Sequence, residues 1–407
     1  MMERYKAYKE SGLPWLRTIP EHWEISRAKD MFKRMSRSVK ETDEIITCFR
    51  DGQVTLRKLR RKDGFTESFK EIGYQGIRKG DLVIHQMDAF AGAIGISDSD
   101  GKGTPVYICL QPINHLYYNT YYAYLLREMA SSQFIFSLRK GIRERSCDFR
   151  YDTFATLYLP VPPLEEQQEI VAYLDRETVR IDRIVELLTK QRERYAQLKR
   201  SLISEVVTHG LPHHNPANYR TLRLKDIVDI YKGRDGAGEF EYQEGFYPVL
   251  SLAYLRGQIE NPSFSPISPN SIICNGGELI IIWDGAGIGE ILIAKKGLLS
   301  STTSVIKERK GIVLRDYVYA LRYYIEDAIK NNPTGMGIPH VNPHTLTTLP
   351  ISLPPLEEQQ EIVAYLDERC KRLDRLVEAI DRKIDLLGSL KKSLIEEVVT
   401  GQRRITN

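Results

Sequence analysis

Basic side chains gather in two short runs within the first 150 residues of the chain. The residues of these runs are Arg57, Lys58, Arg60, Arg61 and Lys62, then Arg139, Lys140, Arg143 and Arg145. Lysine and arginine bind phosphate oxygens, and one arginine can also form two hydrogen bonds to the O6 and N7 atoms of a guanine. The two runs therefore predict a contact with nucleic acid, although composition alone fits a solvated loop equally well.

A second group of candidate binding residues lies on segments of the second half that are rich in glycine, serine and proline. These candidates are Lys232, Arg234, Thr302, Thr303, His340 and Asn342. Asn and His side chains can reach base edges in a DNA groove, but a purely structural turn remains open as an alternative. Residues 1–161 contain 26 Lys and Arg against 20 Asp and Glu, whereas residues 209–353 contain 14 of each. This difference favours a polyanionic partner for the first stretch.

Two segments of the chain partly match motifs of enzymes that act alone, but neither match is complete. Residues 285–289 are glycine-rich, but a strand-like segment follows and no Gly-Lys-Ser/Thr triplet occurs. Residues 261–264 differ by one residue from the motif with which adenine methyltransferases hold a flipped base. His209, His213 and His214 have no Cys or carboxylate at ligand spacing, so we expect a solvated linker there. We expect neither catalytic residues nor a metal site.

The chain has the composition of a protein of the reduced cytosol. Its five cysteines are widely spaced and form no Cys-x-x-Cys pair, which argues against a disulfide framework. No apolar segment follows Met1 and Met2, and the most apolar run, residues 279–283, is too short to cross a bilayer. We therefore expect a cytoplasmic protein that does not interact with membranes.

One stretch of fourteen residues occurs twice without a change, at residues 162–175 and again at 354–367. Each copy follows a stretch of about 150 residues that mixes helix and strand signals, with strands expected near 82–84 and 279–283. The repeat predicts an α+β protein made of one duplicated module, with pseudo-twofold symmetry between its halves. The expected ranges are 1–161 and 209–353 for two similar globular α/β domains, 162–208 for the first helix, and 354–407 for the second helix with a C-terminal tail.

Both repeated stretches open a long helix with apolar residues seven apart. These residues are Leu174, Ile181, Leu188, Tyr195 and Leu202 in the first helix, and Leu366, Leu373, Ile380, Leu387 and Leu394 in the second. Such spacing is typical of a coiled coil. Because each domain precedes its own helix, we expect the helices to pair antiparallel and to separate the two domains. A second column, three residues after the first, is only partly apolar: it contains Ile184, Leu198, Leu376 and Leu390, but Gln191 and Lys383 interrupt it.

The polar start of each helix is also duplicated. It contains Glu165, Glu166, Gln167 and Gln168 in the first copy, and Glu357, Glu358, Gln359 and Gln360 in the second. Carboxylates in a first turn stabilise a helix by about 0.3–1 kcal/mol. Many sequences would serve that purpose, so the identity of the two copies favours a surface that the same partner uses twice.

Three features of the chain resemble the specificity subunit of type I restriction-modification systems. The first is the Pro-Pro-Leu-Glu-Glu-Gln-Gln junction into a helix, which occurs at residues 162–168, where Leu-Pro-x precedes it, and again at residues 354–360, where Ile-Ser-Leu precedes it. The second is the opening at residues 15–23, and the third is the Gly-Ile-Pro-His-Val-Asn segment at residues 337–342. The first domain ends differently, which implies that the two domains belong to different recognition subtypes.

The resemblance implies a DNA reader without catalytic activity. Each target recognition domain would read one half of a bipartite, asymmetric site in double-stranded DNA, and the paired helices would set the gap between the halves. Two modification subunits, which bind S-adenosylmethionine, would dock along the helices. Restriction subunits that use ATP would join them, so that this chain itself would bind no cofactor. Two alternatives stay open: a self-contained DNA adenine methyltransferase or nuclease, and a coiled-coil scaffold that binds no nucleic acid.

Overall fold

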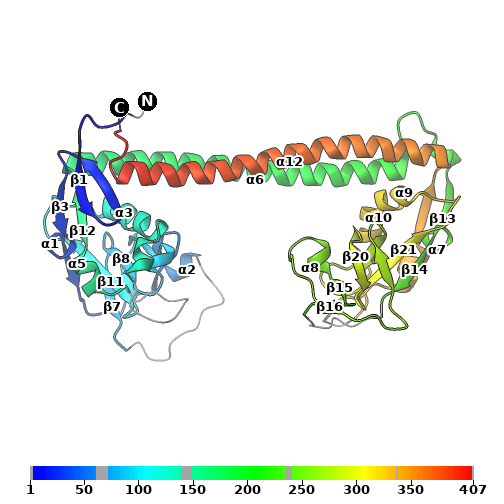
Figure 1. Cartoon of the computed structure of the whole chain (residues 1–407), viewed down its shortest axis with the longest axis horizontal. Helices are drawn as coiled ribbons and strands as arrows, with labels where there is room; N and C mark the ends of the chain where they lie inside the picture. The colour runs from blue at the N-terminus through cyan, green and yellow to red at the C-terminus, as the bar shows by residue number, and fades with distance from the viewer. Residues whose placement is uncertain (1–2, 61–71, 139–148, 235–240, 336, 406–407) are drawn as a thin grey trace. The chain divides into compact units, whose positions relative to one another are not determined.

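The computed structural model describes residues 3–60, 72–138, 149–234, 241–335 and 337–405. The chain divides into two compact units, which are residues 1–187 with 383–407 (unit 1) and residues 188–382 (unit 2). Two long helices, α6 (Leu164–His209) and α12 (Leu356–Val399), contribute one part to each unit (Figure 1). Neither these nor any other helix of the described residues is long and apolar enough to cross a membrane.

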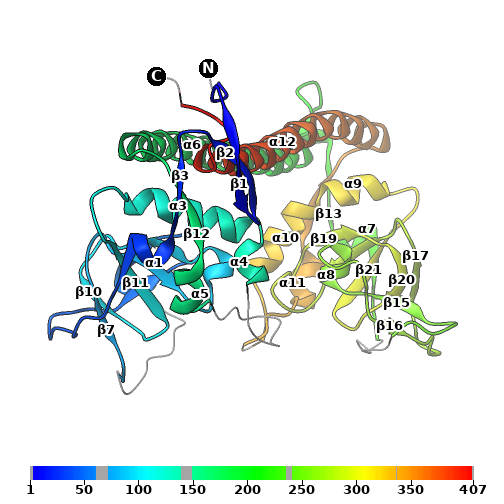
Figure 2. The ribbon, with the colours of Figure 1, turned by 60° about the vertical axis from the view of Figure 1, so that its left-hand side comes forward.

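Unit 1 is built around a four-stranded antiparallel sheet in the order β4-β11-β8-β9. Its strands are β4 (Phe32–Met35), β8 (Leu82–His85), β9 (Ile94–Ile96) and β11 (Tyr107–Pro112). Helix α3 (Asn119–Ser131) packs on β8 and β9 and lies between the sheet and the long helices (Figure 2). A two-stranded sheet of β3 (Glu24–Arg27) and β12 (Tyr158–Val161) leads into α6.

Shorter elements complete unit 1. They are β1 (Tyr8–Leu13), β2 (Leu16–Pro20), α1 (Ala28–Met31), β5 (Ile46–Cys48), β6 (Val54–Leu56), α2 (Arg57–Arg60), β7 (Gln75–Ile77), the 3-10 turn η1 (Ala89–Ala91), β10 (Gly101–Gly103), α4 (Phe134–Ser137) and α5 (Tyr151–Thr156). The strand pairs β1-β2, β5-β6 and β7-β10 are all antiparallel.

Unit 2 repeats the central arrangement with the sheet order β14-β21-β18-β19. Its strands are β14 (Val228–Lys232), β18 (Leu279–Ile282), β19 (Ile291–Ile293) and β21 (Thr303–Glu308). The pair β13 (Arg220–Arg223) and β22 (Pro350–Leu353) leads into α12 as β3 and β12 lead into α6. The repeat predicted from the sequence is therefore a repeat of one fold, with helices and strands mixed in each copy.

The remaining elements of unit 2 differ more from unit 1. They are the 3-10 turn η2 (Pro216–Asn218), α7 (Leu224–Ile227), β15 (Tyr247–Leu250), α8 (Leu252–Leu255), β16 (Phe264–Ser265), β17 (Ile273–Asn275), β20 (Lys296–Leu299), α9 (Arg315–Ala320), α10 (Arg322–Lys330) and α11 (Pro343–Thr348). Helices α9 and α10 follow one another directly and are separated at Leu321.

The long helices pair antiparallel within each unit. In unit 2, Arg192 of α6 contacts Asp381 of α12 and Lys199 contacts Asp374, so a step of seven residues forward in one helix matches seven residues back in the other. In unit 1, Lys391 contacts Asp182 at 2.6 Å. The antiparallel direction that connectivity predicts is thus the direction observed in each unit.

The predicted heptad residues line the contact between the helices. Leu174, Ile181, Leu366, Ile380 and Leu394 are buried, whereas Leu188, Tyr195, Leu202, Leu373 and Leu387 are half-buried. The second column differs from the expectation, because it lies four residues after the first and not three. Thr178, Val206 and Val398 of this column are buried, while the expected Leu198 and Leu390 are 52% and 54% exposed.

Charged residues explain why the pattern of apolar residues predicted the wrong second column of the contact between α6 and α12. The observed column includes Arg192, Lys199 and Lys391, which a search for apolar residues passes over. Long basic side chains can cover a helix seam with their methylene groups while the charged end reaches water or an opposite charge. Here each charged end reaches an Asp of the facing helix.

Each globular core is closed by the start of one long helix and the end of the other. In unit 1 the core contains Leu174 from α6 and Val399 from α12, and the buried Tyr121 donates its hydroxyl proton to the Val399 carbonyl at 2.8 Å. In unit 2 the equivalent Tyr317 donates to the carbonyl of Val207 near the end of α6. The ends of the helices are therefore part of the domain cores, beyond the boundaries at 161 and 353 that the sequence indicates.

Candidate nucleic-acid interface and subunit-docking surface

The described part of the first basic run forms α2, a single turn on the surface of unit 1. Arg60 contacts Asp51 at 2.6 Å and its guanidinium lies over the ring of Phe49 at 4.3 Å. Lys58 contacts Glu44 at 2.5 Å, and both basic side chains remain exposed. The hydrogen bond from Arg60 lowers the pKa of the Asp51 carboxyl, which keeps this pair charged.

Arg57 is held by Ile45, which precedes β5, and by Thr47 of β5. Its amide donates to the carbonyl of Ile45 and its side chain donates to the hydroxyl of Thr47 at 3.2 Å. These contacts fix the first residue of α2, so that Lys58 and Arg60 project from a defined turn. The other predicted basic residues, Arg61, Lys62, Arg139, Lys140, Arg143 and Arg145, lie outside the described residues.

In unit 2 the structure brings together candidates that are more than 100 residues apart in the chain. Lys232, at the end of β14, lies 3.2 Å from Asp284, and His340 lies 2.5 Å from the other oxygen of the same carboxylate. The Lys232 ammonium is also 5.3 Å from the ring centre of Trp283. We call Lys232, Trp283, Asp284, Thr302 and His340 the unit 2 polar cluster.

Backbone hydrogen bonds hold this cluster at the ends of the central strands. The Trp283 amide donates to the carbonyl of Thr302, and the Val341 amide donates to the carbonyl of Trp283. The Gly285 amide donates to the carbonyl of Pro339, and the positive φ of Gly285, 92°, suits a residue without a side chain. The glycine-rich loop at 285–289 therefore supports the loop that carries His340, and it does not form a nucleotide-binding turn.

Two predicted contact residues of unit 2 make hydrogen bonds within the unit. Asn342 caps α11, since its side-chain oxygen accepts hydrogen bonds from the amides of His344 and Thr345. Thr303 is buried and donates to the carbonyl of Ser300. Arg234 and Thr302 are exposed. Sequence reasoning missed Trp283 and Asp284, because it treated residues 279–283 only as an apolar strand.

The duplicated helix starts contain one glutamine each that is fully buried. The Gln167 amide group donates to the carbonyls of Leu116 and Pro162, and its oxygen accepts from the Tyr118 amide. Gln359 makes the equivalent three bonds in unit 2, to Ile312, Pro354 and Leu314. Gln167 and Gln359 thus tie the helix to the loop before α3 or α9, and they are not exposed to a partner as expected.

The second glutamate of each copy is also engaged within its own unit. Glu166 accepts hydrogen bonds from the Tyr5 hydroxyl and from the Trp23 indole, and it lies 2.8 Å from His22. Glu358 contacts His214 at 3.3 Å. The expected partner surface is accordingly reduced to the exposed members of the two quartets, which are Glu165, Gln168, Glu357 and Gln360.

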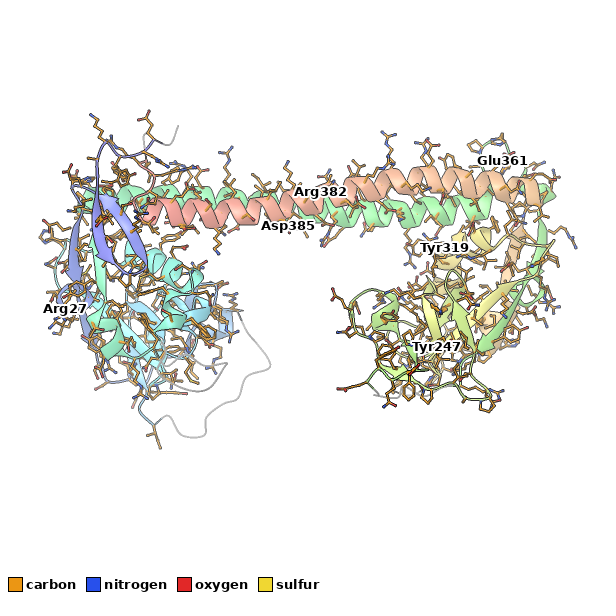
Figure 3. The ribbon with its side chains drawn as sticks, in the orientation of Figure 1. Arg27, Tyr247, Tyr319, Glu361, Arg382 and Asp385 are labelled. Atoms are coloured by element: carbon orange, nitrogen blue, oxygen red, sulfur yellow. The ribbon has the colours of Figure 1, made fainter. Side chains whose placement is uncertain are left out.

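Side chains project outward from both long helices (Figure 3), and several large apolar ones are exposed. In unit 1 these are Val179, Leu187, Leu386 and Leu390, and in unit 2 they are Leu198 and Leu376. Their exposed fractions range from 40% for Leu376 to 69% for Leu386. Several exposed apolar residues on one element are characteristic of a surface that another protein covers.

Comparison with known proteins gives one consistent family. A model of the type I restriction modification DNA specificity domain matches the chain twice, at residues 20–193 and 216–385. The type I restriction enzyme MjaVIII specificity subunit of Methanocaldococcus jannaschii is 34% identical over 193 residues, which cover 47% of this chain and 44% of that protein. The provisionally named MjaX specificity subunit of the same organism is 24% identical and covers 95% of each chain.

Solved structures show the same fold over nearly the whole chain. A chain from a structural study of the assembly and conformational transition of a type I restriction-modification system has a TM-score of 0.74 at 19% identity, and the match covers 94% of this chain and 99% of that one. The HsdS subunit from Thermoanaerobacter tengcongensis has a TM-score of 0.54 at 19% identity, covering 94% and 98%.

Proposed function

The chain belongs to the family of type I restriction-modification DNA specificity proteins, and we propose that it is the subunit that selects the DNA sequence for such a system. The observation that carries this proposal is the duplication. The family domain occurs twice, and each copy presents its own cluster of basic and polar side chains. Two copies of one domain with different loops suit a DNA site made of two different halves.

Within each unit we assign phosphate contact to the exposed basic residues. Lys58 and Arg60 in unit 1, and Lys232 in unit 2, are each paired with a carboxylate that a phosphate can replace. His340 shares the Asp284 carboxylate with Lys232, and the exposed Thr302 accepts a backbone hydrogen bond from Trp283. Both side chains offer hydrogen bonds to base edges. The phosphate contacts would dominate affinity and make it fall with salt, while the loop contacts would determine sequence.

We further propose that two modification subunits dock along the long helices, one for each half of the repeat. The exposed apolar residues of α6 and α12 support this proposal. Contact of apolar side chains with water is unfavourable, and a docked subunit would cover them. Glu165 and Gln168 in one copy, and Glu357 and Gln360 in the other, offer identical polar positions at the starts of the helices.

The chemistry of the complex would then reside in the partner subunits. The modification subunits would bind S-adenosylmethionine, the restriction subunits would bind ATP, and this chain would bind neither and would work in the cytoplasm. Because the match to the first relative covers less than half of that protein, the activity and partners of the whole complex are part of this proposal.

Retention of duplex DNA tests the proposal. The chain is purified with and without its modification subunit and is titrated with duplex DNA that contains the methylated site. We expect binding by the complex that weakens steeply as salt rises. Methyl transfer by the chain alone would favour a self-contained enzyme, and a complex that retains no duplex DNA would favour a scaffold.

A further inference from the structure

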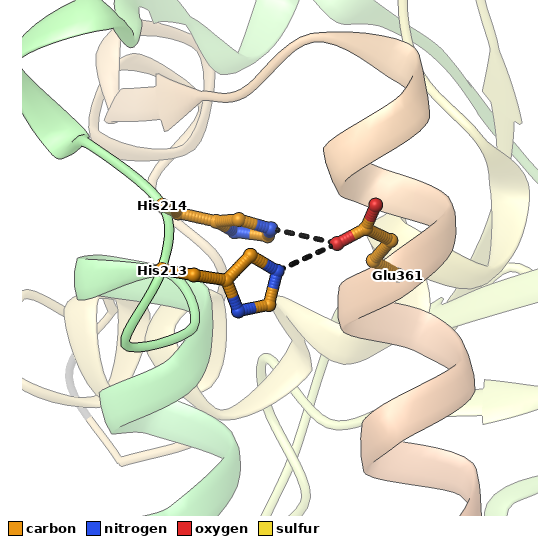
Figure 4. A group of neighbouring side chains, drawn as sticks. All are labelled: His213, His214 and Glu361. Carbon is orange, nitrogen blue, oxygen red and sulfur yellow. Dashed lines mark hydrogen bonds and ion pairs between the residues drawn. The ribbon is translucent and has the colours of Figure 1, made fainter.

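A cluster of two histidines and a glutamate lies where the linker after α6 meets the start of α12 in unit 2. His213 Nε2 is 2.9 Å and His214 Nε2 is 3.1 Å from the same carboxylate oxygen of Glu361 (Figure 4). One nitrogen from each ring and one oxygen of the carboxylate all lie within 4.8 Å of one another. The spacing of residues in the sequence could not reveal this group, because Glu361 is 147 positions from His214.

We propose that His213, His214 and Glu361 bind a divalent transition-metal ion, with Zn²⁺ as the best match. Two imidazole nitrogens and one carboxylate oxygen are a donor set that zinc accepts, and a water molecule can complete four-coordination. Hard ions such as Mg²⁺ and Ca²⁺ prefer oxygen ligands only. The shared oxygen of Glu361 sits beside both rings, so a small movement of exposed side chains would open the position for the ion.

A second carboxylate, that of Glu358, lies on the Nδ1 side of the His214 ring and supports this assignment. Glu358 Oε2 is 3.3 Å from His214 Nδ1, and this oxygen is buried and accepts no hydrogen bond from the described part of the chain. Histidine ligands of metals almost always donate their other N–H to such a group. In this structure His214 Nδ1 accepts a hydrogen bond from the Leu211 amide. Binding of the ion at Nε2 would place the ring proton on Nδ1, which would exchange that bond for one donated to Glu358.

The linker holds His214 in place before any ion arrives. His214 Nδ1 lies 3.2 Å from the Tyr219 hydroxyl and from the Leu211 amide, and its side chain is only 3% exposed. Gly210 ends the helix with a φ of 75°, and a side chain there would collide with the Tyr219 hydroxyl.

The remaining two ligands are open to solvent. The side chains of His213 and Glu361 are 65% and 53% exposed, which gives an ion a path to the site. A bound ion would fasten the linker, and with it the start of the second domain, to α12. This is a structural role, independent of DNA sequence recognition.

The first copy of the repeat provides a matched control. Glu169 and Glu166 occupy the positions of Glu361 and Glu358, but Glu166 contacts His22, Tyr5 and Trp23. Among the described residues, no group of three possible metal ligands occurs in unit 1. The same substitution can therefore be made in both copies with opposite expectations.

The test uses the full chain without a histidine tag, stripped of metal by a chelator and titrated with Zn²⁺ by calorimetry. We expect about one ion per chain, and a loss of affinity of about tenfold or more in both His213→Gln and Glu361→Gln, with no change in Glu169→Gln. X-ray absorption should give Zn–N distances of about 2.0–2.1 Å. Because both substituted residues are exposed, circular dichroism should show unchanged folding.

Two results would overturn the proposal. One is wild-type chain that binds Zn²⁺ no more tightly than Glu361→Gln, which would leave the cluster as an ion pair of histidines and carboxylates. The other is an equal loss of affinity in Glu169→Gln, which would place the ion elsewhere.

Discussion

Replacement of Gln167 by Ala should destabilise unit 1 strongly, although this residue belongs to the polar start of a helix. The substitution leaves the carbonyls of Leu116 and Pro162 and the amide of Tyr118 without their partner in a fully buried position. Each orphaned buried group costs on the order of 1 kcal/mol or more, so we expect a loss of about 3 kcal/mol in the free energy of unfolding.

Urea denaturation followed by tryptophan fluorescence measures this loss. The three tryptophans are Trp15 and Trp23 in unit 1 and Trp283 in unit 2, so a Trp283→Phe background restricts the signal to unit 1. Gln168→Ala is the matched control: it changes the exposed neighbour and should cost less than about 0.5 kcal/mol.

The result also separates two explanations for the identical glutamines. If Gln167→Ala left the unfolding midpoint unchanged and weakened only the binding of the modification subunit, the intramolecular role would be refuted. Gln359→Ala should reproduce the destabilisation in unit 2, because Gln359 makes the same three bonds there.

Burial and repulsion from Glu396 raise the pKa of Glu128 from its ordinary value of 4.5 to about 7 in the folded state. Stability therefore falls as the pH rises from the unfolded to the folded pKa, and it stays at the lower level above the folded pKa. Glu128→Gln should therefore be more stable than wild type at pH 8, by about 1–2 kcal/mol after screening. The stability of wild type should rise as the pH falls from 8 to 5, and that of Glu128→Gln should rise less. Equal pH profiles of the two proteins would contradict this. Lys232→Ala should weaken DNA binding by the complex and reduce the slope of log affinity against log salt by about 1, while Lys225→Ala on α7 should leave the slope unchanged. Insertion of four residues into both long helices adds about 6 Å and should lengthen the tolerated gap in the methylated site by one or two base pairs; an unchanged gap would show that the helices do not set it.

The sequence predicted the fold well where the signal is local and repeated. The seven-residue spacing and the identical junctions predicted two long helices and a duplicated α+β module, and the order of domains and helices along the chain predicted the antiparallel direction. The second column of the helix contact was predicted wrongly, since Lys199 and Lys391 occupy it through ion pairs with the facing helix. A pattern of apolar residues contains no information on such pairs.

The candidate sites were harder to predict, because they depend on contacts between distant segments. Asp284 joins Lys232 to His340 only after β14 and β18 have been placed in one sheet. Glu361 contacts His213 and His214 only because the linker after α6 lies beside the start of α12. Gln167 was predicted to face a partner because its segment is repeated without a change, yet the turn of the helix directs its side chain into the core.

Mapping of methylated adenines after a domain exchange tests the central claim most directly. Residues 1–161 are replaced by the corresponding residues of a relative, the complete system is expressed in cells, and the methylated sequence is determined. If each copy of the module reads one half of the site, only one half of the methylated sequence should change. A change in both halves, or in neither, would contradict the assignment of one recognition domain to each half.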